Sequence, residues 1–335
     1  MKKALEIDPL SHRTHYLLGW YYSTIKKDSA SAVPELERAI STSPTSVNEE
    51  KQLNTMLSDA YLRLKQTDKA VEMIKRMVAA SPDAFTWNNA AYSLADNDVQ
   101  LDLAAQYADS ALSALYTQLN TMGSATLRTA DFLLMGQLVN TWDTRGWIYF
   151  KNGDTTNAEK YVRAAWTIGQ GREVGEHLGE ICEKLGRKQD AIHFYAMTAA
   201  LPPFQQSAPN LSRERLIKML GKPRAELLIN QSTGSQSMER TLHLGKIAPD
   251  GTHGEFYFVF TPGPKLESIQ VISGDTALRN HLQEMSSQIA GSIIFPDTTP
   301  TKLFRQGMVT CSPYSKGCIL VFYNTDTGGM MGGGR

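Results

Sequence analysis

The sequence predicts an all-α array of repeated helix pairs, followed by a small α+β domain. Two observations lead to this fold class. Between His12 and Pro203, small and large apolar residues recur at the same spacing in successive segments, which is typical of stacked helical units. Beyond Glu239 the apolar residues alternate with a period of two, which indicates strands.

The clearest helical unit lies between Trp142 and Trp166 and is predicted to form two helices separated by residues 152–154, Asn-Gly-Asp. Glycine suits the end of the first helix, and aspartate suits the start of the second because its carboxylate can accept a hydrogen bond from a free backbone N–H. Small residues such as Gly146 and Ala158 let the two helices approach closely. A single unit cannot bury its apolar face alone, so neighbouring units are expected.

Further segments keep this spacing. In one segment, each matching residue lies 33 positions after its counterpart in the clearest unit, so that Gly179 corresponds to Gly146. In another segment, the turn contains one extra residue. Unrelated amphipathic helices would not share the same turn spacing, so about five units are predicted between His12 and Pro203. In chain order, the matching positions outside the clearest unit are Leu18, Gly19, Tyr22, Ala32, Leu36 and Ala39; Ser58, Tyr61, Ala70, Ile74 and Met77; Asn89, Tyr92, Ala105 and Ala111; and Gly179, Cys182, Ala191, Tyr195 and Thr198.

This spacing resembles the tetratricopeptide repeat, a helix–turn–helix unit that recurs about every 34 residues. The resemblance implies a right-handed superhelix of helix pairs. It also implies a concave surface, on which this family usually binds protein or peptide ligands. Residues 4–9 resemble the end of a repeat's second helix, so we expect that the chain begins inside a longer array or is a fragment. Residues 1–8 lack the apolar core of a signal peptide.

The segments outside the repeats complete the predicted organisation. Residues 119–139 belong to no unit, and a helix beginning at Ala130 is expected to run on into the Trp142 helix. The proline-rich stretch 201–209 cannot continue a helix. A short helix is predicted over 212–220 and a flexible linker over 230–237. The predicted domains are a repeat array over 1–203, a linker with a short helix over 204–238, an α+β domain over 239–325 and a flexible Gly-rich tail over 326–335.

The α+β domain is predicted from alternating apolar residues and one amphipathic segment. Its elements follow the order strand, strand, strand, helix, strand, strand, which predicts one sheet with a helix packed on one face. The predicted strands lie at about 241–244, 255–260, 266–272, 303–311 and 318–323, and the helix at 276–289.

Part of this domain resembles the C-terminal domain of TonB-type proteins. The resemblance rests on Gly254-Glu255-Phe256, on the segment SIQVISGD at 268–275, and on the amphipathic helix that follows. It covers residues 254–323, although the hairpin between Cys311 and Cys318 departs from the family, which does not require it. The repeats from Trp87 to Phe150 also resemble those of bacterial proteins that carry an upstream transglutaminase-like domain.

Three cysteines are present, and two of them lie in the last predicted hairpin. If Tyr314-Ser315 forms a two-residue turn, Cys311 and Cys318 face each other, and a disulfide there would contribute about 2–3 kcal/mol. Two reduced thiols are the alternative, and a zinc site is least favoured because no second cysteine or histidine pair follows at ligand spacing. Cys182 occupies an interior repeat position and is predicted to be a buried apolar residue.

The composition and motifs exclude several classes of function. The 335 residues contain 34 basic and 34 acidic side chains, so no basic field for nucleic acid is expected. No apolar run approaches the roughly 18 residues that a membrane span needs. Nucleotide-binding glycine loops, metalloprotease motifs and nucleophile elbows are absent. We therefore predict no enzyme activity, no cofactor and no metal.

Glutamates at a spacing of three and four residues share one face of the first helix in the last repeat. The repeat register places that face on the concave surface, where an acidic stripe beside exposed aromatic side chains would suit a basic peptide. A solvated charged face is the commoner explanation of such a pattern. The candidate partner-binding residues are Arg13, Tyr16, Trp20, Asn140, Asp143, Trp147, Glu173, Glu176 and Glu180.

These observations favour a non-enzymatic module that binds a protein or peptide partner on its concave face. The TonB-like resemblance and the cysteine pair favour an extracytoplasmic, periplasmic location in a bacterium, and a cytoplasmic scaffold with reduced thiols is the alternative. A second possibility is the regulatory or substrate-docking half of a larger enzyme, for example one with a transglutaminase-like domain upstream.

Overall fold

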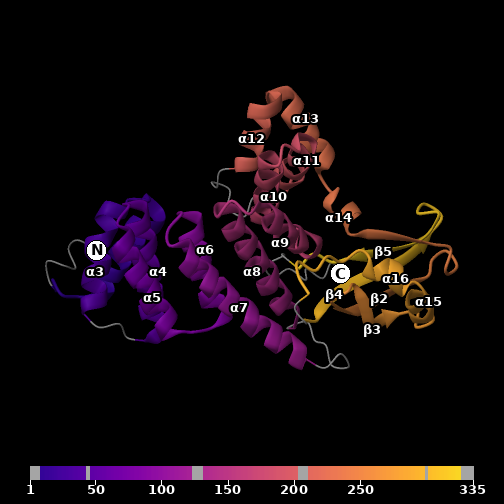
Figure 1. Ribbon diagram of the computed structural model, residues 1–335, viewed down its shortest axis with the longest axis horizontal. Coiled ribbons are helices and arrows are strands. Elements are labelled where there is room, and N and C mark those ends of the chain that lie inside the picture. The colour runs from indigo at the N-terminus through magenta and orange to yellow at the C-terminus, as the bar shows by residue number, and fades with distance from the viewer. Residues whose placement is uncertain (1–7, 43–45, 123–130, 203–209, 299–300, 326–335) are drawn as a thin grey trace. The chain divides into compact units, whose positions relative to one another are not determined.

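A computed structural model of the chain describes residues 8–42, 46–122, 131–202, 210–298 and 301–325 (Figure 1). The chain divides into two compact units, residues 1–111 and residues 112–335. The helix that contains the division, α7, runs from Leu101 to Thr121. The predicted boundary between residues 203 and 204 falls inside the second unit.

The first unit consists of helices in the described segments. Aspartate or serine side chains begin several of them: Asp28, Ser46 and Asp83 each accept a hydrogen bond from the backbone N–H three residues further on, which satisfies one of the free donors of a helix start. The helices are α2 (His12–Trp20), the π-helical turn η1 (Tyr21–Lys26), α3 (Ser29–Ser41), α4 (Val47–Arg63), α5 (Thr67–Ala80) and α6 (Ala84–Asp96).

Close packing at glycine confirms the predicted repeat register. A Cβ added to Gly19 would lie 2.4 Å from Leu36 Cδ2, and one added to Gly146 would lie 2.5 Å from Val162 Cγ2. Each small residue therefore receives a large residue of the second helix in its own pair. One extra residue was predicted in the first repeat, and η1 accommodates it. A π-helix contains one more residue per hydrogen-bonded turn than an α-helix.

The second unit continues the helix pairs and then forms a sheet. The prediction that one long helix contains Trp142 is confirmed by α8, although its expected start at Ala130 lies outside the described residues. The helices are α8 (Phe132–Lys151), α9 (Thr155–Ile168), α10 (Arg172–Lys184), α11 (Lys188–Ala199), α12 (Leu211–Leu220), α13 (Lys222–Ser232) and α14 (Gln236–Glu239).

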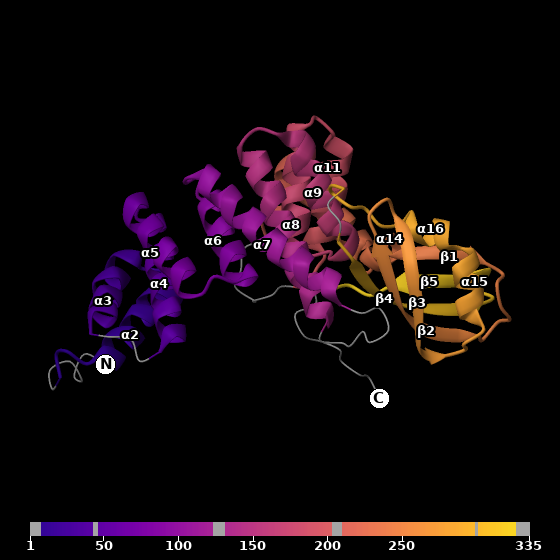
Figure 2. The same cartoon turned by 60° about the horizontal axis from the view of Figure 1, so that its bottom comes forward.

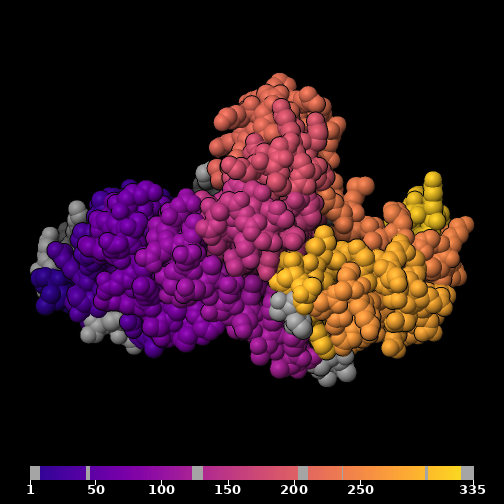
Figure 3. Space-filling model, in the orientation of Figure 1, coloured from indigo at the N-terminus to yellow at the C-terminus, as the bar shows by residue number. Residues whose placement is uncertain are grey.

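The flexible linker predicted over residues 230–237 is a wrong prediction. Residues 230–232 complete α13, and α14 follows after a short turn. Gly221 has a positive φ of 77°, which separates α12 from α13, and Pro223 lies in the first turn of α13, where its missing N–H costs nothing. Ala225 and Ile229 of α13 are buried, so tertiary packing holds this segment in helix. Both α12 and α13 pack against α11, and Figure 3 shows their surfaces beside one another.

The sheet has five antiparallel strands in the order β1-β5-β4-β2-β3. The predicted element order is confirmed, except that the predicted helix is two short helices, α15 and α16, which pack beside β3 (Figure 2). The bounds are β1 (Thr241–Gly245), β2 (His253–Thr261), β3 (Lys265–Gly274), α15 (Leu278–Glu284), α16 (Ser286–Ala290), β4 (Leu303–Ser312) and β5 (Gly317–Phe322). The predicted fold class, helical repeats followed by a small α+β domain, is therefore confirmed.

The two faces of β2 have different neighbours. Phe256, Phe258 and Phe260 point to one face and are fully buried, as the period of a strand requires. Tyr257 points to the other face, where its ring lies 4.9 Å from that of Phe132 in α8. The sheet is therefore joined to the helix pairs of the same unit through this second face.

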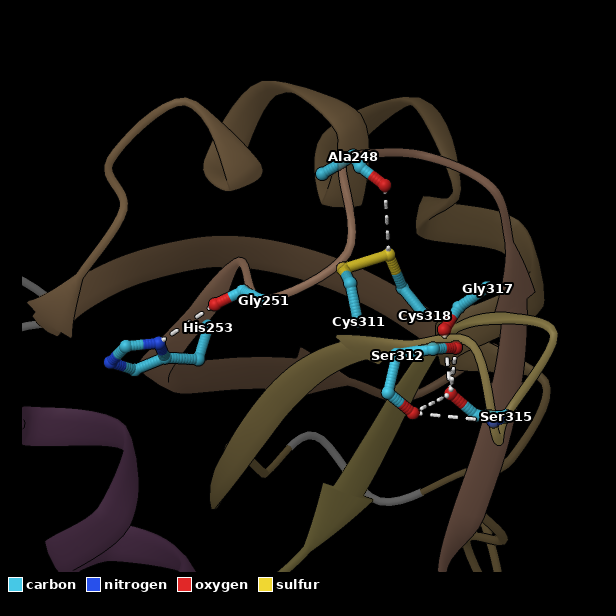
Figure 4. Close-up of a disulfide and its surroundings, with 8 residues drawn as sticks. All are labelled: Ala248, Gly251, His253, Cys311, Ser312, Ser315, Gly317 and Cys318. Atoms are coloured by element: carbon cyan, nitrogen blue, oxygen red, sulfur yellow. Dashed lines mark hydrogen bonds between the residues drawn. A yellow bond between two sulfur atoms is a disulfide. The ribbon is translucent and has the colours of Figure 1, made fainter.

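The hairpin between β4 and β5 contains a disulfide (Figure 4). Cys311 and Cys318 are direct partners across the two strands. The loop is longer than the predicted two-residue turn, since Ser312 pairs with Gly317 and four residues lie between them. The hydroxyl of Ser315 donates to the Gly317 carbonyl at 2.6 Å, which braces the loop from inside.

Candidate functional site

A groove of about 1080 Å³ runs along the first helices of consecutive repeats in the first unit. The first helices of the repeats in this unit each present one face to the groove, and side chains three and four residues apart share that face. Most of the lining comes from α2, α4 and α6. The principal lining residues are Tyr16, Trp20, Lys51, Gln52, Thr55, Met56, Asp59, Arg63, Phe85, Asn89, Tyr92 and Asp96.

Aromatic and amide side chains give the groove its chemical character. Trp20 and Phe85 are 41% and 55% exposed, which is unusual for such large apolar groups and leaves their surface available to a partner. The hydroxyl of Tyr16 donates to Gln52 Oε1 at 2.7 Å and joins α2 to α4 across the groove wall. Asn89 supplies a further exposed amide from α6.

The charges that line the groove are balanced, since Lys51 and Arg63 accompany Asp59 and Asp96. Lys51 donates to the Thr86 hydroxyl and lies 3.7 Å from Asp83 Oδ2, so its charge is already partnered. Loss of solvent raises the pKa of Asp59, and the nearby Arg63 guanidinium opposes that shift. The groove therefore has no strong preference for a ligand of one charge.

Two of the three residues predicted in the first repeat line this groove. Tyr16 and Trp20 do so, whereas Arg13 is exposed but is not part of the lining. Sequence analysis missed the residues of α4 and α6. Gln52, Thr55 and Asp59 occupy the positions in the next repeat that correspond to Arg13, Tyr16 and Trp20. The repeat spacing was therefore sufficient to predict these three lining residues. In the repeat that contains α6, the spacing is looser. Sequence analysis recognised Tyr92 there as a repeat position but not as a lining residue, and it did not single out Phe85.

The residues predicted in α8 do not form an open surface. Asn140 is exposed, but Asp143 and Trp147 are buried, with Trp147 only 5% exposed. The expectation of an exposed aromatic side chain at Trp147 is therefore wrong. Its indole stacks on the His177 ring at 3.9 Å between centroids and on Phe150 at 4.9 Å. Packing between α8 and α10, which sequence spacing does not show, covers it.

A buried ion pair lies beside Trp147. His177 Nδ1 lies 2.9 Å from Asp143 Oδ2 and 3.0 Å from Oδ1. Burial alone would lower the pKa of His177, but the Asp143 carboxylate outweighs it and raises the pKa, with Glu173 and Glu180 acting in the same direction. Asp143 thus holds two successive first helices together rather than facing a partner.

The acidic stripe of α10 has a partner within the chain. Arg215 of α12 forms ion pairs with Glu180 and, at 3.1 Å, with Glu183. Ser212 donates to Glu176 Oε1 at 3.4 Å, and burial raises the pKa of Glu176. Glu173 is exposed. Binding of a basic peptide here stays a prediction, and such a peptide would have to compete with Arg215.

The described parts of the chain contain no group of three or more histidine, cysteine or acidic side chains that could hold a metal ion. Within the same described residues, no helix is long and apolar enough to cross a membrane. Cys182 is fully buried, and burial raises the pKa of its thiol to about 11, so the reactive thiolate is suppressed.

The tetratricopeptide repeat family matches two segments of the sequence, residues 52–83 and 139–168. The first includes most of the pair α4–α5, and the second includes the end of α8 and all of α9. Tetratricopeptide repeats are stacked units whose extended surfaces bind other proteins. The two matched segments are therefore repeats of the tetratricopeptide class. The partner of the chain is unidentified.

Several solved structures are similar to part of this chain. PilW, a widely conserved type IV pilus biogenesis factor, is 18% identical, with a TM-score of 0.43, and the match covers 68% of this chain and 91% of PilW. PilF of Pseudomonas aeruginosa is 15% identical, with a TM-score of 0.40 and coverages of 68% and 89%. A thermophilic tetratricopeptide repeat protein of Thermus thermophilus is 19% identical, with a TM-score of 0.41 and coverages of 65% and 100%. Scores this low support no conclusion about function. No curated protein matches the sequence.

Proposed function

We propose that the protein is a non-enzymatic binding protein that holds a segment of a protein partner in the groove formed by α2, α4 and α6. The observation that carries the proposal is the groove itself, which is lined by the first helices of three consecutive repeats. Its exposed aromatic residues, Trp20 and Phe85, are of the type that supplies most of the binding energy in protein interfaces.

The lining suits an extended peptide better than a small molecule. Gln52, Asn89 and Asn97 present side-chain amides, and an amide can both donate to and accept from a peptide backbone. The aromatic rings can cover apolar side chains of the same peptide. Because the charged groups of the groove are balanced, we expect binding to depend only weakly on salt concentration.

Site-specific photo-crosslinking in the native host tests this proposal. A photoreactive amino acid replaces Asn89 inside the groove, and the matched control carries it at Arg76, which is exposed on α5 and does not line the groove. We expect one recurrent partner to be captured at position 89 and not at position 76.

Capture is then repeated in the double variant Trp20→Ala, Phe85→Ala. Trp20 is 41% exposed and Phe85 55%, and neither belongs to the buried core, so the fold should persist. We expect the yield of the adduct to fall at least tenfold. Equal capture at both positions, or an adduct that survives the double substitution, would count against the groove.

We propose further that the protein works in the bacterial cell envelope and that its C-terminal domain is TonB-like. The cysteine pair supports this location, because disulfides persist in oxidising compartments. Mass spectrometry of protein purified from its native host, with free thiols blocked at lysis, tests the location. A closed bond between Cys311 and Cys318 is expected, whereas two blocked thiols would favour a cytoplasmic scaffold.

A further inference from the structure

A second cavity lies inside the second unit, between the end of α9 and the sheet. Its volume is about 70 Å³, several times the roughly 10–15 Å³ that one water molecule needs. Two of its lining residues are arginines, one from β4 and one that precedes β1. The lining consists of Trp166, Thr167, Gln170, Glu239, Arg240, Leu242, Ser292, Ile293, Arg305 and Phe322.

Arg305 is a buried cation without a carboxylate partner among the described residues. Its side chain is 1% exposed, and its guanidinium lies over the Phe322 ring at 4.9 Å. Nη1 donates to the Thr167 carbonyl at 2.8 Å and Nη2 to the Tyr323 carbonyl at 3.1 Å, but the buried Nε has no hydrogen-bond partner in the described parts of the chain. An unpaired buried donor on a charged group is costly, so native structures normally satisfy it.

Arg240 places a second positive charge at the same cavity. Its Nε donates to Gln170 Oε1 at 2.9 Å and its Nη1 to the Phe322 carbonyl at 2.7 Å. Neither arginine forms an ion pair with any residue that the structure describes. Burial and the neighbouring Arg240 lower the pKa of Arg305 to about 9. An arginine side chain stays protonated in proteins, so both guanidinium groups are charged at neutral pH.

The acidic side chain of the lining, Glu239, does not neutralise this pair. Its Oε2 accepts from Trp166 Nε1 at 2.8 Å and from Gln170 Nε2 at 3.1 Å, and its Oε1 lies 2.6 Å from His193 Nε2. The hydrogen bond to Glu239 raises the pKa of His193, which adds positive charge near the carboxylate. Among the described residues around the cavity, the positive charges of Arg240, Arg305 and protonated His193 therefore outnumber the carboxylate of Glu239.

We propose that this cavity binds a small oxyanion, a carboxylate or a phosphate, which accepts a hydrogen bond from Arg305 Nε and pairs with Arg240. Guanidinium groups bind both anions through charge-assisted hydrogen bonds, which are about twice as strong as neutral ones. The apolar residues Leu242, Ile293 and Phe322 leave room for the methyl group of a small carboxylate. The bound anion would join the end of α9 to β4 and so stabilise the second unit.

Calorimetric titration and thermal unfolding of the full chain test the proposal. Sodium phosphate and sodium acetate are the probes, and sodium chloride at the same ionic strength is the reference. We expect saturable binding of one probe, with a matching rise in the unfolding temperature. The probe that binds saturably shows whether the ligand of the cavity is a phosphate or a carboxylate. The affinity should fall at least tenfold in Arg305→Met and in Arg240→Met. Arg279→Met removes an exposed arginine of α15 and should bind as the wild type does.

Two results would overturn the proposal. One is stabilisation of the same size in all four proteins, which is the general effect of excluded salts on any folded chain. The other is the absence of saturable binding by either probe. Arg240 is only partly buried, so Arg240→Met preserves the test if Arg305→Met does not fold.

Discussion

At the level of single residues, the pair of Asp143 and His177 shows how a charged contact stabilises the repeat array. The two side chains come from α8 and α10 and are buried together under Trp147. An uncompensated charge at this depth would be strongly destabilising. The pair therefore requires that both partners remain charged.

This requirement makes the stability of the second unit depend on pH. The Asp143 carboxylate raises the pKa of His177 above its ordinary value despite burial. A raised pKa in the folded state means that the stabilisation is fully present below the ordinary pKa, near pH 6.5, and is lost as the pH rises through the folded value. We expect the free energy of unfolding to fall from pH 6 to pH 9, measured by urea denaturation, and His177→Gln to reduce that slope.

The control for the histidine is His281→Gln, because His281 is exposed on α15. Its slope should match that of the wild type. If His177→Gln left the pH dependence unchanged, the pair would not be the source of the effect.

The burial of Asn54 lowers the stability of the folded protein. It is fully buried on α4, and neither its amide nitrogen nor its amide oxygen has a hydrogen-bond partner among the described residues. Replacing an unsatisfied buried amide by an apolar group of similar size should stabilise the protein by about 1–3 kcal/mol. We predict this gain for Asn54→Leu in urea denaturation. Asn48→Leu, on the exposed side of the same helix, should change the free energy by less than about 0.5 kcal/mol.

Between helices, close contact at glycine determines how each pair packs. A Cβ added to Gly179 would lie 2.3 Å from Cε1 of Tyr195, a ring that is itself fully buried. The ring cannot move without disturbing its hydrogen bond to Glu183 at 2.7 Å. Small residues at these positions are therefore required by the geometry of the pair α10–α11.

Gly179→Ala is predicted to reduce the free energy of unfolding by about 1–3 kcal/mol, because a well-packed contact must open. The matched control is Gly136→Ala in α8, where the added Cβ would meet only the Thr325 carbonyl at 3.5 Å. That change should be neutral or should stabilise the helix by up to about 1 kcal/mol. Equal losses in both variants, measured by thermal unfolding, would contradict the packing explanation.

At the level of the whole chain, the second unit joins its helix pairs to the sheet. Met135 of α8 is fully buried, and its sulfur accepts a hydrogen bond from the Phe304 N–H at 3.2 Å. Tyr161 of α9 donates to Asp297, and Arg305 of β4 donates to the Thr167 carbonyl. Contacts that bury apolar surface on both sides make separate unfolding of the two parts unfavourable.

Met135→Ala should therefore destabilise the sheet as well as the helices. Removing this buried side chain leaves a cavity and costs about 2–5 kcal/mol. We expect hydrogen exchange to show faster exchange in both α8 and β4. Leu133→Ala, at a position that is 68% exposed, should leave both unchanged. Faster exchange confined to α8 would show that the helix pairs and the sheet unfold independently.

The local patterns of the sequence were sufficient for most of the fold. Helix pairs, their turns and the small residues between them depend on neighbours three, four and about sixteen residues away, so they are visible in spacing, as Gly146 and Val162 illustrate. The strand order along the chain and the facing of Cys311 and Cys318 follow from a period of two. Two lining residues of the groove, Tyr16 and Trp20, were also predicted, because they belong to the shared register.

Only the tertiary structure decided which of these surfaces remain open. Trp147 is covered by His177, and the acidic stripe of α10 is paired with Arg215. The segment 230–237, predicted as a flexible linker, is mostly helix because α13 buries Ile229. The arginine cavity likewise combines residues that are far apart in the chain. Such contacts depend on which helix packs against which, and the free energy of that choice is spread over many apolar contacts that no local pattern records.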